Sequence, residues 1–181
     1  FDGELRLDDA THPIDAWVGS QNHNWGVRHT DAYAWGQVAG FDGAPETFLE
    51  VSTARVRLGP IWSPWMTLLV LRHEGREYAL NGVAQALRAE GRYGFFTWTF
   101  ASASDDVSVE GRIEAPPERF VGLPYDNPPG GRKTCINTKL ARCALTLRRE
   151  GRKAVELTTA SRAAFEILTD RDDHGVPVLG V

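Results

Sequence analysis

The middle of the chain contains Val107-Ser108-Val109-Glu110-Gly111-Arg112-Ile113-Glu114, in which apolar side chains alternate with polar ones. Side chains of a β-strand point to opposite faces in turn, so this alternation predicts a strand with one buried face. The same period of two recurs over Cys143–Leu147 and Val155–Thr159. Further strands, rich in β-branched and aromatic residues, are predicted over residues 1–7, 33–41, 47–58, 65–73, 77–80, 95–102 and 162–168.

Glycine-containing turns separate these segments. Glu74-Gly75, Glu150-Gly151 and Asp42-Gly43 each stand between two predicted strands. Glycine accepts the positive φ that a tight hairpin needs. About ten strands joined in this way predict an all-β fold, and we favour a closed antiparallel barrel because closure leaves no unpaired edge.

Two segments interrupt the strand pattern. A short helix is predicted between Asn81, as its N-cap, and Gly91, as its end. This helix would either close a barrel mouth as a plug or lid, or simply connect two strands. Proline and glycine crowd the second segment, Leu123 to Gly131, so it is predicted to be a shaped loop. Such loops often carry sites, which makes Tyr125 and Asn127 candidate ligand-binding residues.

The length and composition of the chain limit its domain number and the kinds of partner it can have. The 181 residues, 42% of them hydrophobic, suit a single domain over 1–181. The formal net charge is −4 and the basic residues are scattered, which argues against nucleic acid as a partner. No apolar run approaches the length of a transmembrane segment. Cys135 and Cys143 either pair or stay free, and free thiols are favoured. The chain starts at Phe1 rather than Met, so we expect a segment upstream of it.

One predicted strand has two unequal faces. Tyr33, Trp35 and Gln37 share one face, and small residues occupy the other. Tyr, Trp and Gln each carry a polar group that needs a partner when it is buried. A ligand cavity would satisfy that need, so this face is predicted to look into an apolar hollow.

The next strand offers an acid for the same hollow. Phe48 and Glu50 share a face, and hairpin pairing would bring Glu50 beside Trp35 or Gln37. Burial among aromatic rings would raise the pKa of this carboxyl group and keep it protonated. It could then protonate an alkene, and the aromatic faces would stabilise the resulting cation. In the alternative, Glu50 faces solvent or pairs with Arg55 or Arg57.

The other candidates are histidine and tryptophan. His23 lies in a polar loop, where it either acts chemically or holds the loop by a hydrogen bond. The spacing of His23 and His29 fits no metal site. Trp98 is a candidate for lining the cavity, with plain core as the alternative. Trp62 and Trp65 flank a proline turn and are predicted to form a rim at the cavity mouth, where one edge is wet.

Two motifs resemble one known family. His23-Asn24-Trp25-Gly26 followed by Tyr33-Ala34-Trp35-Gly36-Gln37, and the later Tyr125-Asp126-Asn127-Pro128-Pro129-Gly130 with Cys135-Ile136-Asn137-Thr138, are similar to segments of the tocopherol cyclase and hydroxyneurosporene synthase (carotenoid hydratase) group. The resemblance implies a lipocalin-like barrel. It also implies that this chain is the C-terminal barrel of two, with an upstream barrel of the same protein as its partner.

The resemblance also implies an activity. Members of the group protonate a double bond of a long isoprenoid and then add water or close a ring, without a redox cofactor. His23, Tyr33 and Glu50 become the catalytic candidates, although Glu50 stands where an Asp is expected. Trp25, Trp35, Gln37 and Phe48 would bind the ligand.

Three functional hypotheses follow. The first is a cofactor-independent isoprenoid cyclase or hydratase. The second is a non-catalytic module that binds a lipid or another hydrophobic small molecule. The third is a structural half whose partner barrel holds the site.

Overall fold

A computed structural model describes residues 1–21, 30–126 and 131–180. Strands make up most of this described chain, while helix is limited there to α1 (Val83–Arg88) and a 3₁₀ turn at Pro117–Arg119. The all-β expectation is therefore confirmed. No helix in the described ranges has the length and apolar character needed to cross a membrane.

The largest element is a ten-stranded sheet in which all pairs are antiparallel. Its strands in spatial order are β8 (Arg76–Leu80), β7 (Met66–His73), β4 (Ala44–Arg55), β3 (Ala32–Phe41), β14 (Val155–Thr169), β13 (Arg132–Arg149), β11 (Val107–Glu114), β10 (Thr97–Ala103) and β9 (Glu90–Tyr93), while β12 (Val121–Asp126) pairs with β13.

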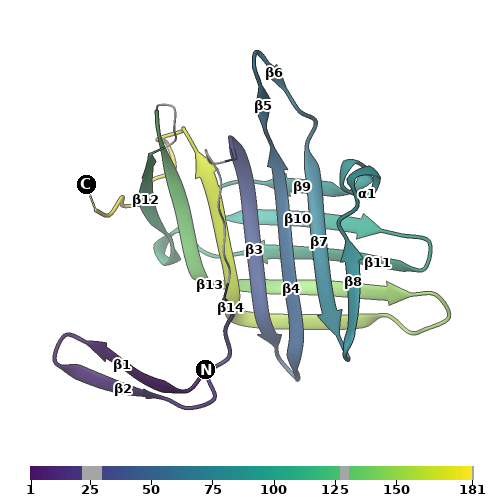
Figure 1. Cartoon of the computed structure of the whole chain (residues 1–181), viewed down its shortest axis with the longest axis horizontal. Helices are drawn as coiled ribbons and strands as arrows, with labels where there is room; N and C mark the ends of the chain where they lie inside the picture. The colour runs from purple at the N-terminus through teal and green to yellow at the C-terminus, as the bar shows by residue number, and fades with distance from the viewer. Residues whose placement is uncertain (22–29, 127–130, 181) are drawn as a thin grey trace.

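The sheet folds over on itself into two layers (Figure 1). The front layer contains β3, β4, β7 and β8, and the strands of the back layer, β9, β10 and β11, run across them. The long strands β13 and β14 belong to both layers. Their pairing shifts register between Thr138 and Ala141 and again before Cys143. Such irregularities bend a strand, which explains how β13 passes from one layer to the other.

The space between the layers is filled by side chains. Trp98 is fully buried there, and its Nε1–H donates a hydrogen bond to Thr53 Oγ1 at 3.2 Å. A Cβ on Gly36 would lie 2.8 Å from Ile113 Cδ1 and 3.0 Å from Trp98 Cζ3, so the layers contact each other directly at this level. Trp98 therefore belongs to the core cluster, the alternative considered for it.

The sheet has two free edges within the described residues. Its order ends at β8 on one side and β9 on the other, and no ladder joins them. The antiparallel sheet is thus confirmed, and within the described residues no closed barrel is detected. Helix α1 connects β8 to β9 and contacts β7 and β10, so it spans the seam between the layers. Its caps are Gly82 and Ala89, which corrects the prediction of Asn81 and Gly91.

The turn between β7 and β8 has the backbone geometry of a tight hairpin. Glu74 and Gly75 both have positive φ between the paired residues His73 and Arg76, as a type I′ hairpin requires.

Pro124, predicted to lie in a loop, lies instead in β12. The strand tolerates proline because β12 has a ladder on one side only, so the missing N–H breaks no second ladder.

Two small hairpins project from this body. The pair β1 (Gly3–Leu7) and β2 (Ala10–Ile14) forms an arm at the N-terminus that extends away from the sheet (Figure 1). The pair β5 (Arg57–Leu58) and β6 (Ile61–Trp62) continues upward from β4 and leads into β7. The second hairpin carries Trp62 to one end of the two layers.

Candidate functional site

The face predicted to look into a cavity points outward instead. On β3, Ala34 and Val38 are fully buried between the layers, whereas Tyr33 and Trp35 are half-buried on the outer face of the front layer. Gln37 lies on that outer face too and accepts a hydrogen bond from the Ser20 hydroxyl. The small side chains turn inward because Trp98 already occupies the space opposite Gly36.

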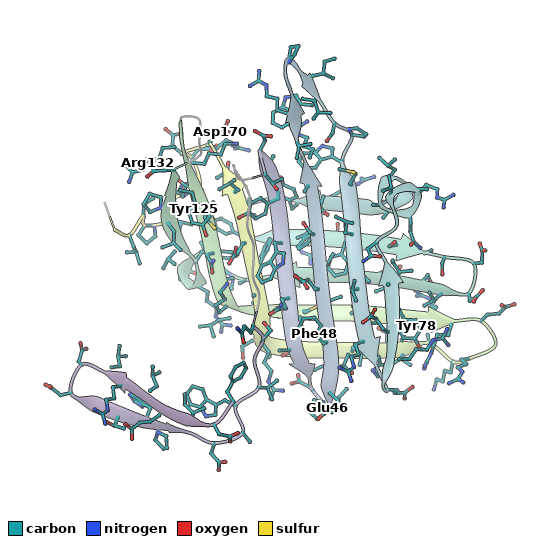
Figure 2. The ribbon with its side chains drawn as sticks, in the orientation of Figure 1. Glu46, Phe48, Tyr78, Tyr125, Arg132 and Asp170 are labelled. Carbon is teal, nitrogen blue, oxygen red and sulfur yellow. The ribbon has the colours of Figure 1, made fainter. Side chains whose placement is uncertain are left out.

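The predicted meeting of Trp35 and Glu50 is confirmed. Trp35 Nε1–H donates to Glu50 Oε1 at 3.0 Å, and Gln37 is the direct cross-strand partner of Glu50. Neither Arg55 nor Arg57 forms an ion pair with Glu50 in the described part of the chain. Phe48 shares this outer face further down β4, where Figure 2 labels it.

A second acid lies on the other side of Trp35. Glu166 pairs across strands with Trp35, accepts a hydrogen bond from Asn137 Nδ2 at 2.6 Å and pairs with Lys139 at 2.7 Å. The Lys139 ammonium also lies 5.4 Å from the Trp35 ring centre. Trp35 is therefore surrounded by a polar network on an outer surface.

Tyr33, Tyr125 and Cys135 form a neighbouring cluster. Burial, with contributions from Cys135 and Glu166, raises the pKa of Tyr33 well above its ordinary value. Burial and the same thiol raise the pKa of Tyr125 to about 12, and burial raises that of Cys135 to about 11. At neutral pH all three groups keep their protons, so they act as hydrogen-bond donors here and not as bases. Both cysteines are free. The remaining predicted site residues, His23, Trp25 and Asn127, lie outside the described residues.

A cavity of about 500 Å³ opens at one end of the two layers, where β3 begins and β4 and β14 end. We call it the end pocket. Figure 2 labels Asp170, one of its residues, at the end of the front layer opposite Phe48. The lining residues are Asp31, Ala32, Arg55, Trp62, Trp65, Gly91, Arg92, Tyr93, Gly94, Phe95, Lys133, Ile167, Leu168, Thr169, Asp170 and Arg171.

Aromatic rings form much of the pocket wall. Trp62 and Trp65 are 37% and 41% exposed and both line the end pocket, which is a different cavity from the one whose rim they were predicted to form. Tyr93 packs edge-on against Trp65, with 5.6 Å between ring centres. Burial raises the pKa of Tyr93 to about 12, against the opposing charge of Arg55. The wall therefore offers apolar faces and a neutral phenol to a bound molecule.

Sequence reasoning missed most of this site. Arg55 was considered only as a partner for Glu50, and Tyr93, Phe95 and Lys133 were not considered at all. The available signal was the position of Arg55 near the end of a predicted strand, shortly before the Trp62-to-Trp65 turn. Because the lining comes from seven separate parts of the chain, no local motif contains it.

Comparison with known proteins gives relatives without a described role. The chain is 30% identical over 147 residues to an uncharacterized protein that occurs in two strains of Mycobacterium tuberculosis. The match covers 78% of this chain, and the chain spans only 42% of the length of these curated relatives. No protein-family model matches the sequence. No solved structure matches it significantly.

Proposed function

We propose that this domain binds an apolar small molecule in the end pocket, without acting on it chemically. The observation that carries the proposal is a cavity of about 500 Å³ walled by Trp62, Trp65, Tyr93 and Phe95. Ligand pockets typically have volumes of about 300–1,000 Å³ and are lined by aromatic and apolar side chains with a few polar groups. Two exposed indoles at the rim also need a reason, because aromatic clusters at a surface usually mark a binding site.

The acids available in the pocket favour binding over proton transfer. Asp31 Oδ2 accepts a hydrogen bond from the backbone N–H of Arg57 at 2.7 Å, so this carboxyl group is already engaged by the protein. Glu50, the predicted proton donor, lines neither the end pocket nor the cavities of about 360 and 440 Å³ elsewhere on the surface. Those two cavities have no tryptophan in their walls.

Binding can be tested with N-phenyl-1-naphthylamine, an uncharged probe that fluoresces in apolar surroundings. We expect Trp62→Ala to weaken probe binding about tenfold, since one aromatic contact contributes about 1–1.5 kcal/mol. Trp17→Ala is the matched control, because Trp17 is also exposed but lies outside the pocket. Equal binding by the two variants, or no binding by the wild type, would refute the proposal. If the wild type binds the probe, native mass spectrometry of freshly purified protein would identify any natural ligand.

A second candidate is the isoprenoid cyclase or hydratase, with no redox cofactor. The hydrogen bond between Trp35 and Glu50 supports it only in placing a carboxyl group beside an aromatic ring. This candidate includes a lipocalin-like arrangement of the sheet and an upstream barrel as partner. The greater length of the relatives is consistent with a further domain. Glu50→Gln should then fold normally and lose turnover of a polyene or prenylated substrate, and unchanged turnover would exclude Glu50 from the mechanism.

A further inference from the structure

The end pocket is basic although the protein is acidic. Two carboxylates, Asp31 and Asp170, line it together with four cationic side chains: Arg55, Arg92, Lys133 and Arg171. The whole chain carries a formal charge of −4. A concentration of positive charge against that background favours an anionic ligand, because a cleft lined by one sign of charge raises the local concentration of the opposite sign.

Most of these cations are already engaged by the protein. Arg171 forms two hydrogen bonds with the Asp173 carboxylate, and Arg92 lies 3.9 Å from Glu90. The Lys133 ammonium donates to the backbone carbonyl of Asp31. None of these three side chains is therefore the first choice for holding a ligand.

Arg55 differs from the other three. Its guanidinium carbon lies 4.2 Å from the centre of the Trp62 ring and 4.5 Å from that of Trp65. No described residue forms an ion pair with Arg55 or accepts a hydrogen bond from it, and its Nε is buried without a partner. A buried donor without an acceptor costs free energy, so Arg55 favours an added acceptor group beside it.

The aromatic contacts of Arg55 are compatible with an acceptor. The five N–H donors of a guanidinium lie in its plane, so a guanidinium that stacks on an indole can still bond through its terminal nitrogens. These nitrogens match the two oxygens of a carboxylate in a bidentate geometry. The aromatic contacts reduce the motion of the side chain, which lowers the entropy lost on binding.

We propose that the ligand of the end pocket is an amphipathic carboxylate. Arg55 binds its head group, Lys133 adds positive charge nearby, and its apolar body lies against Tyr93 and Phe95. This inference rests on the proposed binding function and adds to it the chemical class of the ligand. It predicts that the pocket prefers a charged molecule to an uncharged one that has the same apolar body.

The test uses a matched pair of competitors for N-phenyl-1-naphthylamine: decanoate and decan-1-ol, at pH 7.5. They share a ten-carbon chain and differ in the charge of the head group. We expect decanoate to displace the probe from the full chain at a concentration at least tenfold lower than decan-1-ol. Arg55→Met should abolish this preference, and the comparison of two competitors within one variant corrects for any change in probe affinity. Arg55→Lys should keep part of the preference, since it retains the charge and loses the bidentate geometry.

Arg72→Met is the control, because Arg72 is exposed on β7 and outside the pocket, and it should behave like the wild type. Cooperative thermal unfolding of each variant would verify its fold. If the probe binds but decanoate has no advantage, or if Arg55→Lys and Arg55→Met lower the affinities of both competitors equally, the inference fails while the binding function stands. If the wild type does not bind the probe at all, both are overturned.

Discussion

Gly36 is a residue at which the two layers contact each other directly. A Cβ at this position would lie 2.8 Å from Ile113 Cδ1, 3.0 Å from Trp98 Cζ3 and 3.2 Å from the Ala164 carbonyl oxygen. The first two side chains are fully buried and the third atom is backbone, so none of them can move freely. The absence of a side chain on β3 is thus what allows Trp98 to fill the core.

Gly36→Ala should therefore lower the free energy of unfolding by about 1–3 kcal/mol, the usual cost of adding a methyl group to a packed core. Urea denaturation followed by tryptophan fluorescence would measure it. Gly94→Ala is the matched control, because its new Cβ would meet no atom within 4 Å. That variant should be as stable as the wild type or slightly more stable. If the two variants had the same stability, the direct contact of the layers at Gly36 would be refuted.

At the scale of single elements, alternation predicts strands well but does not say which face is buried. The strand predicted around Val107 matches β11, and the two unequal faces of β3 are real. Yet a period of two is the same whichever face turns inward. The outcome on β3 was decided by the back layer, whose Trp98 and Ile113 come from positions more than 60 residues later in the chain.

The long strands show a second limit of local patterns. The sequence suggested separate strands over 155–159 and 162–168, whereas β14 is continuous over both. The alternation is interrupted because residues 160–162 are exposed where β14 passes from one layer to the other, although the same side of the strand is buried before and after them. Pro124 in β12 shows that position in the sheet can override a local signal. Proline is normally excluded from strands because it lacks an N–H for the ladder, but an edge strand has one side without a ladder.

At the scale of the whole molecule, the end pocket depends on the folding of the sheet into two layers. Asp31, Arg55, Tyr93, Lys133 and Asp170 come from five regions and meet only because β3, β4, β9, β13 and β14 reach the same end. The aromatic part was predictable, since two tryptophans around a proline turn are hard to bury. The cationic part was not, because nothing in a local pattern distinguishes Arg55 from an ordinary solvated arginine.

The two ends of the described chain differ in how they attach to this sheet. At the N-terminal end, the arm of β1 and β2 closes on itself, with backbone hydrogen bonds between Phe1 and Trp17 and almost every residue exposed. At the C-terminal end, Val176 is buried, and the backbone of Gly122 in β12 bonds with Pro177 and Leu179 at 2.8 Å each. The N-terminal arm therefore projects from the sheet, whereas the C-terminal segment is bonded to β12.

Removal of residues 1–17 should consequently leave the free energy of unfolding within about 0.5 kcal/mol of the full chain, since surface changes rarely cost more. Removal of residues 174–181 should lower it by about 3 kcal/mol, because it exposes the site of one buried valine side chain and breaks two backbone hydrogen bonds. Urea denaturation of the two truncated proteins beside the full chain would measure the difference. Equal losses from both truncations would mean that the arm packs on the sheet in solution, contrary to the exposure described for it.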